Sequence, residues 1–200
     1  MRALNVDLDR WDPWTPAEIA ERLRGVEAQW YVLAGWALDL FLGHQTREHA
    51  DLEIGVPNDG FPEIRSTLGD LELVVVGDGR AWAMSDESLT TYRQTWGREP
   101  GGPWRLDVIR ERWDGDEWLY RRDPRIQLPA TRAIARTSKG IPFLRPEVVL
   151  LFKAKAVRPK DQLDFELVLP ELEHCSRAWL IESLSVTHPG HPWIDRLSSS

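Results

Sequence analysis

Two acidic residues separated by a single position are the first candidates for chemistry in this sequence. The segment DLEIGV, residues 51–56, alternates in polarity. As a β-strand it would place Leu52, Ile54 and Val56 on one face and the carboxylates of Asp51 and Glu53 on the other. Hard carboxylate oxygens are the ligands that Mg²⁺ prefers. The pair therefore predicts half of a magnesium site on one face of one strand.

A third carboxylate comes from another predicted strand, WRLDVIR at residues 104–110. In this strand Leu106 and Val108 would point to one face of the sheet and Asp107 to the opposite face. Nucleotidyl transfer with two metal ions needs ligands that hold both ions at the attacking and leaving oxygens, and a carboxylate from a neighbouring strand commonly completes the set. The alternative is structural: acid pairs are common on solvated sheet faces, and Asp107 could pair with Arg105.

Several predicted elements would position these side chains. Thr15-Pro16-Ala17-Glu18 is a capping box that opens a helix through residue 26. A short strand at 29–33 ends in a tight turn at Ala34-Gly35 and is followed by a helix over 36–42. Further along we expect a helix at 61–68 and a buried strand at 71–76.

The second half of the chain has a different character. We expect a hairpin around residues 138–140, a helix opening at Pro146, a second over 162–169 and a third over 176–184. The tail from Val186 is expected to be a loop or a loosely docked terminus. A boundary at Pro129 would divide a catalytic core, residues 1–129, from a C-terminal hairpin and helical portion, residues 130–200, that closes the cleft.

Three separated blocks carry a resemblance to a known family. The first runs from Leu33-Ala34-Gly35-Trp36-Ala37 through Thr46-Arg47 and His49 to Asp51-Leu52-Glu53, the second is Trp104 to Asp107, and the third spans residues 144–165. In order and spacing they resemble the aminoglycoside 2″-nucleotidyltransferase family of the DNA polymerase β superfamily. The resemblance implies an α/β (α+β) fold with a polymerase β-type core, a short mixed sheet with flanking helices, and a C-terminal helical portion.

The resemblance also implies roles for individual residues. Asp51 and Glu53 would bind two Mg²⁺ ions, and Asp107 would bind one and could accept the acceptor's hydroxyl proton. The co-substrate would be a nucleoside triphosphate, foremost ATP. The residues implied to contact the nucleotide are Ala34, Gly35, Arg47, His49, Lys153 and Lys160.

Each nucleotide contact has a plainer alternative. The turn at Gly35 could be an ordinary strand-to-helix connection, although helix N-termini do offer free N–H groups to anions. Arg47 and His49 could lie on a charged loop edge, and at most one of Lys153, Lys155 and Lys160 is expected to face a cleft. Acids and tryptophans between residues 113 and 118 could line a pocket for a cationic substrate or merely decorate a surface loop.

The sequence departs from the family at two positions. The first glycine of the family's Gly-Gly-Trp-Ala turn is Ala34 here, so a left-handed backbone at that residue would be strained, and Gly35 would have to supply the open backbone. The second acid is Glu53 rather than Asp. Its extra methylene matters because Mg²⁺ demands near-octahedral geometry.

Composition limits the partners. The chain has 200 residues, a net charge of −7 and one cysteine, Cys175. The charge opposes an extended nucleic-acid footprint, and no apolar run is long enough to predict a membrane span. We expect a cytoplasmic enzyme that modifies a hydroxyl of a small molecule, with an aminoglycoside-like antibiotic as the leading analogy. Modification of tRNA or protein, or a degenerate nucleotide-binding or antitoxin-like member, stays open, as does the oligomeric state.

Overall fold

A computed structural model describes residues 1–199, which group into two compact units. The first unit comprises Met1–Leu33 and Glu48–Gly115. The second unit comprises Ala34–Arg47 and the chain from Asp116 onward. The expected boundary at Pro129 falls within the second unit, so the functional division at that residue stays a prediction.

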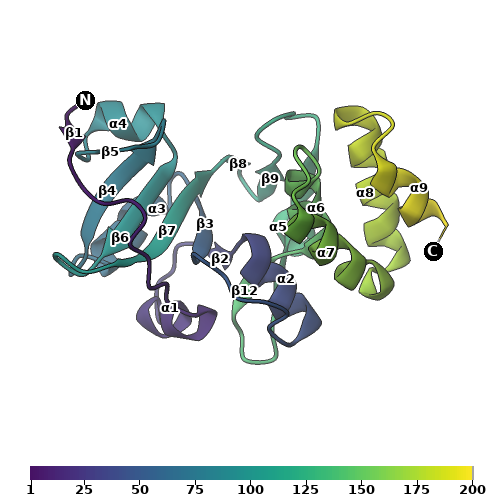
Figure 1. Ribbon diagram of the computed structural model, residues 1–200, viewed down its shortest axis with the longest axis horizontal. Helices are drawn as coiled ribbons and strands as arrows, with labels where there is room; N and C mark the ends of the chain where they lie inside the picture. The colour runs from purple at the N-terminus through teal and green to yellow at the C-terminus, as the bar shows by residue number, and fades with distance from the viewer. Residues whose placement is uncertain (200) are drawn as a thin grey trace. The chain divides into compact units, whose positions relative to one another are not determined.

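The first unit is built on a mixed β-sheet (Figure 1). Its strands follow the order β1-β5-β4-β6-β7-β3-β2. β3 and β7 run parallel, whereas the other neighbouring pairs are antiparallel. The expected mixed sheet of an α/β fold is thereby confirmed. The strand bounds are β1 Ala3–Leu4, β2 Tyr31–Val32, β3 Glu53–Pro57, β4 Glu72–Gly77, β5 Arg80–Trp82, β6 Gln94–Arg98 and β7 Trp104–Glu111.

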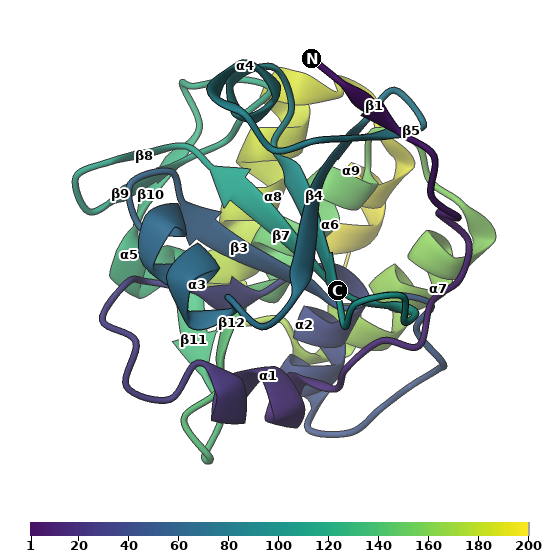
Figure 2. The ribbon, with the colours of Figure 1, turned by 90° about the vertical axis from the view of Figure 1, so that its left-hand side faces the viewer.

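Helices of the first unit begin at clear sequence signals. In α1, Pro16–Arg22, the Thr15 hydroxyl accepts from the Glu18 N–H at 3.3 Å while the Glu18 carboxylate accepts from the Thr15 N–H at 2.7 Å, so the capping box is confirmed. The other helices are α3, Phe61–Thr67, and α4, Asp86–Thr91. α1 and α4 lie at opposite ends of the sheet in both Figure 1 and Figure 2.

The segment between residues 77 and 103 carries three elements that sequence reasoning did not anticipate: β5, α4 and β6. The missing signal is easy to trace in β6, whose residues QTWGR lack a run of apolar side chains. Its pairing with β4 on one side and β7 on the other makes it a strand. Tertiary pairing, rather than intrinsic propensity, decides such cases.

The alternation expected in β3 is present. Leu52, Ile54 and Val56 are fully buried, whereas Asp51 is exposed and Glu53 partly exposed. In β7, Leu106 and Val108 are buried on the same side of the sheet as these apolar residues. Burial of one apolar face fixes the register, because a slip by one residue would move every side chain to the other face.

The second unit is mainly helical. Ala34–Leu42 forms α2, and the expected hairpin is present as β11, Ile134–Arg136, and β12, Pro142–Leu144, with Gly140 at φ +82° in its turn. The paired strands β9, Glu117–Leu119, and β10, Gln127–Pro129, lead into the short helix α5. The remaining helices are α5 Ala130–Ala133, α6 Pro146–Lys153, α7 Pro159–Val168, the 3-10 turn Leu169–Glu171, α8 His174–Thr187 and α9 Pro192–Ser198.

The C-terminal tail corrects one expectation. Instead of a loop from Val186, the chain continues in α8 to Thr187 and then forms α9. The His191 side chain caps α9 by accepting from the Trp193 N–H, and Trp193 stacks on Phe165 with 4.3 Å between ring centroids. The prediction of a loop was wrong because the prolines and glycine near 189–192 mark a turn between two helices rather than an end. Among the described residues, no helix has the length and apolar character needed to span a bilayer.

Candidate active site

The acidic residues predicted from β3 and β7 meet on one face of the first unit's sheet. β3 and β7 are parallel neighbours, and Glu53 is the register partner of Asp107. Register partners on adjacent strands point to the same face. Asp51 lies two positions ahead of Glu53 on the same side of the chain. The structure thus places Glu53 and Asp107 side by side, with Asp51 immediately before the strand.

Asp107 lies in an unusual environment. Only 3% of the residue is exposed, yet just one of its carboxylate oxygens has a hydrogen bond: Gln94 Nε2 donates to Oδ2 at 2.6 Å. The other oxygen, Oδ1, is buried and makes no hydrogen bond within the described part of the chain. Arg105, the expected ion-pair partner, instead contacts Glu99 at 2.9 Å and Asp12.

Burial raises the pKa of the Asp107 carboxyl well above its usual value, and the neighbouring charges of Glu53 and Asp51 raise it further. The Gln94 amide opposes this rise in pKa by stabilising the carboxylate. The Trp96 indole, on the residue opposite Asp107, does so more weakly, and its N–H makes no hydrogen bond of normal geometry among the described residues. This combination of burial and like charge is characteristic of groups that act in catalysis or bind a cation.

These residues fit the magnesium that the family implies. A buried carboxylate oxygen with no hydrogen bond among the described residues, set beside a second carboxylate in register, offers hard oxygen ligands to a cation. Among the described residues, however, no three Asp, Glu, His or Cys side chains already converge closely enough to hold a metal ion. The metal-binding roles of Asp51, Glu53 and Asp107 therefore stay a prediction.

The turn predicted to cradle phosphate begins the second unit. Ala34, the first residue of α2, has φ +52°, so the left-handed backbone lies at the residue that replaces the family's glycine. Gly35, expected to supply the open backbone, is instead a buried residue of the helix. A left-handed conformation costs a residue with a Cβ about 1–2 kcal/mol, and such strain concentrates at functional sites.

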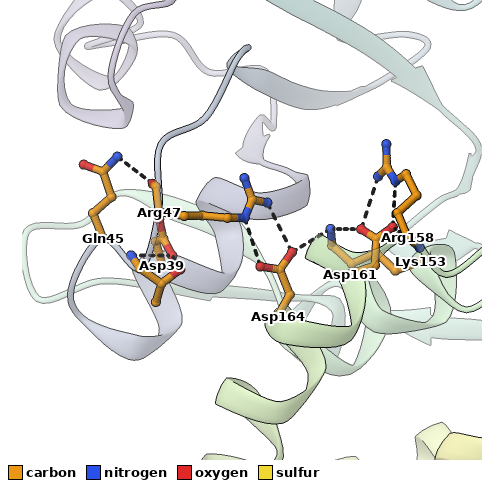
Figure 3. Close-up of polar contacts among 8 residues, drawn as sticks. Asp39, Gln45, Arg47, Lys153, Arg158, Asp161 and Asp164 are labelled. Carbon is orange, nitrogen blue, oxygen red and sulfur yellow. Dashed lines mark hydrogen bonds and ion pairs between the residues drawn. The ribbon is translucent and has the colours of Figure 1, made fainter.

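Arg47 and Lys153 belong to a buried ion network in the second unit (Figure 3). Arg47 Nε and Nη2 donate to the two oxygens of Asp164 at 3.1 and 3.2 Å. Lys153 Nζ lies 2.9 Å from Asp164 and 2.7 Å from Asp161. Arg158 completes the network with a 2.7 Å contact to Asp161. We call these five residues the α6–α7 ion network.

Charges in the α6–α7 ion network are compensated. Burial alone would raise the pKa values of Asp161 and Asp164, but hydrogen bonds from Arg158 and Lys153 to Asp161, and from Arg47 and Lys153 to Asp164, hold both pKa values below normal. The Lys153 side chain is only 8% exposed. Its ammonium group is thus held by two carboxylates, whereas Lys160 and Lys155 are exposed.

Of the other predicted contacts, His49 belongs to the first unit, whereas Ala34, Gly35, Arg47, Lys153 and Lys160 belong to the second. Two tryptophans considered for a cationic pocket are engaged in packing or hydrogen bonding. Trp118 is fully buried against Phe152, with 5.9 Å between ring centroids. The Trp113 indole donates to the Tyr31 hydroxyl at 3.2 Å.

Sequence reasoning missed Gln94 and gave no role to the partners of Lys153. Gln94 lies in the strand that was not anticipated, and an isolated polar residue there carries no local signal. Asp161 and Asp164 did have one: they lie three positions apart, a spacing that places both on one helix face toward a common cation.

Comparison with known proteins supports the implied family. Residues 17–91 match the family model of aminoglycoside-2″-adenylyltransferase. A lincosamide antibiotic adenylyltransferase, LnuA, in its lincomycin-bound form, shares the fold with a TM-score of 0.56 and 16% identity, covering 78% of this chain and 96% of its own. ANT(2″)-Ia in complex with adenylyl-2″-tobramycin shares the fold with a TM-score of 0.57 and 14% sequence identity. The match covers 85% of this chain and 95% of that protein.

A more distant source also carries this fold. An antigenic nucleotidyltransferase-like protein from Paracoccidioides brasiliensis gives a TM-score of 0.50 at 15% identity, covering 92% of this chain and 89% of its own. No curated protein sequence matches the chain. At such low identities the structural likeness shows a common fold, and the family model matches residues 17–91 alone.

Proposed function

We propose that this chain is a nucleotidyltransferase related to aminoglycoside-2″-adenylyltransferase, and that it transfers a nucleoside monophosphate, foremost AMP from ATP, to a hydroxyl group of a small molecule. An antibiotic with several hydroxyl groups is the leading acceptor class. Two solved structures of the same fold support this class, because one contains lincomycin and the other an adenylylated tobramycin.

One observation carries the proposal: Glu53 and Asp107 are register partners on parallel strands, and a buried Asp107 oxygen makes no hydrogen bond within residues 1–199. A protein gains no stability from crowding like charges on one face. A ligand-binding role explains why this cluster is present. Asp51, Glu53 and Asp107 are the residues that would hold Mg²⁺, which when bound supplies charge compensation for the triphosphate.

The proposed reaction is a single in-line displacement. The acceptor's hydroxyl oxygen forms a bond to the α-phosphorus of ATP while the bond from that phosphorus to the bridging oxygen breaks, and pyrophosphate leaves with its electron pair. Asp107 would take the hydroxyl proton. The protein's main contribution is to orient the two reactants.

The test is a transfer assay with labelled nucleoside triphosphates, Mg²⁺ and a panel of aminoglycosides, lincosamides, tRNA and proteins. We expect a labelled small-molecule product together with pyrophosphate. Asp51→Asn should nearly abolish product, whereas Asp59→Asn, which alters an exposed acid in a turn of the same unit, should not. Product only on tRNA or protein would replace the acceptor class, and nucleotide binding without product would favour a degenerate member.

Glu53 allows a sharper test of competence. In a working site adapted to the longer side chain, Glu53→Asp withdraws a ligand oxygen by about one bond length, which Mg²⁺ tolerates poorly, so activity should fall. In a decayed site the same change would restore the family's usual acid and raise activity from a negligible baseline. Rates for wild type and Glu53→Asp at saturating Mg²⁺ decide between the two.

A further inference from the structure

We propose that Gln94 is a positioning residue for the transfer reaction: its amide holds one oxygen of the Asp107 carboxylate and leaves the other available to a cation. The inference rests on the proposed function, because it assigns the purpose of the Asp107 geometry to that reaction. It is carried by the 2.6 Å hydrogen bond from Gln94 Nε2 to Asp107 Oδ2 and by the buried Oδ1, which makes no hydrogen bond in the part of the chain that the structure describes.

Strand register explains how Gln94 reaches Asp107. In the antiparallel β6–β7 pair, Gln94 is opposite Ile109 and Trp96 is opposite Asp107. Gln94 is therefore the diagonal neighbour of Asp107 on the same face of the sheet, at a distance of about 7–8 Å between backbones that only a long side chain can span. A glutamine meets this requirement while contributing no charge.

Neutrality is the important property of this contact. An arginine or lysine at position 94 would pair with Asp107 and cancel the charge that a metal ion needs, as Lys153 does for Asp161 and Asp164 in the second unit. An apolar residue would leave both Asp107 oxygens buried without a hydrogen bond, which carries a large desolvation cost. The amide orients the carboxylate and stabilises its charged form while leaving the net negative charge of the cluster unchanged.

The backbone of Gln94 is well placed for this role. β6 pairs with strands on both sides, so that Gln94 is opposite Val76 of β4 as well as Ile109 of β7. The adjacent residue, Thr95, is fully buried and accepts a 2.8 Å hydrogen bond from Arg110. Positioning groups on paired strands hold their geometry better than groups on loops.

The inference can be tested by metal binding in the full-length chain. Gln94→Met keeps the length of the side chain but removes the donor, and Gln94→Asn keeps an amide but shortens its reach. Mn²⁺ would serve as the probe, measured by calorimetry in the presence of α,β-methylene-ATP, which blocks turnover. We expect both variants to bind Mn²⁺ about tenfold more weakly than wild type, or about 1.4 kcal/mol, and kcat to fall while the acceptor KM is unchanged.

The matched control is Arg98→Met, which alters another residue of β6 whose partner is Glu72 rather than Asp107. It should retain wild-type Mn²⁺ affinity, and urea unfolding should show all variants folded. Wild-type affinity and kcat in both Gln94 variants would overturn the inference while leaving the proposed function intact. If Asp107→Asn also leaves Mn²⁺ affinity unchanged, the proposed metal site itself fails.

Discussion

Asp107 in the first unit and Asp164 in the second are both buried aspartates, but their surroundings are opposite in charge. Asp107 faces two further carboxylates, one neutral amide and one neutral indole. Asp164 contacts a guanidinium and an ammonium group. The pKa is accordingly raised for Asp107 and lowered for Asp164, although burial acts in the same direction on both.

The difference separates two uses of a buried acid. Desolvation penalises any buried charge, and a structural site offsets that penalty with partners from the protein itself. The α6–α7 ion network does so, which makes it part of the second unit's architecture. Asp107 faces further carboxylates instead, and one of its buried oxygens makes no hydrogen bond among the described residues. A binding site for a cationic ligand explains why that cost is tolerated.

The largest expected effect is on catalysis. Asp107→Asn should lower the rate of transfer about a thousandfold, because it removes a ligand of the metal ion that would compensate transition-state charge. It should not destabilise the fold, because it removes repulsion from Glu53. Steady-state kinetics and urea unfolding of the same sample provide the check. An Asp107→Asn variant that stays active, or one that is unfolded, would show that Asp107 serves the fold, as Asp161 and Asp164 do, rather than the reaction.

The second effect is on stability and concerns Lys153. Lys153→Met leaves Asp161 and Asp164 with a missing partner, and breaking a buried ion pair from one side costs about 3–5 kcal/mol. Lys155 is exposed and lies two residues further along the chain, just past the end of α6. The free energy of unfolding of Lys155→Met should therefore stay within about 0.5 kcal/mol of wild type. Urea unfolding followed by Trp fluorescence measures both. Equal stability of the two variants would contradict a structural role for Lys153.

The two regions should also respond to pH in opposite directions. The pKa values of Asp161 and Asp164 are lowered on folding, so their stabilisation is present above the unfolded pKa of about 3.9 and is lost as the pH falls through the folded values. For Asp107 the pKa is raised, so its contribution is present below the unfolded pKa and lost as the pH rises through the folded value.

Urea midpoints from pH 7 down to pH 3 test this contrast without added metal. Wild type should lose stability in acid, and Asp164→Asn should show a flatter acid limb, since it removes one of the groups that must be protonated. Asp107→Asn should instead steepen the acid limb, because it removes a group whose raised pKa adds stability as the pH falls. Identical acid limbs for wild type and Asp164→Asn would mean that the network does not stabilise the native state.

The smallest effect concerns the strained turn at the start of the second unit. Ala34→Gly removes the Cβ from a residue at φ +52°. The backbone strain that this relieves exceeds the entropy cost of ordering a glycine, so stability should rise by about 0.5–1 kcal/mol. Ala37→Gly, within the same helix at an ordinary helical position, should instead cost about 1 kcal/mol. Thermal unfolding of the two variants gives opposite shifts if the strain is real.

Local patterns in the sequence determined several features of this protein. The capping box at Thr15, the one-sided burial of Leu52, Ile54 and Val56, and the hairpin turn at Gly140 each depend on residues close together in the chain. The family blocks rest on the same kind of local spacing. Alternation with a period of two residues predicts a strand, and capping residues predict a helix start, from neighbouring positions alone.

Tertiary structure decided the features that depend on distant partners. The register that sets Glu53 beside Asp107, the contact from Gln94, and the compensation of Lys153 by two aspartates each join segments that no local pattern connects. The final helix is a similar case, because Trp193 is anchored by Phe165. Side-chain charge can be read from sequence, but whether a charge is buried, and what faces it, is fixed only when strands and helices pair.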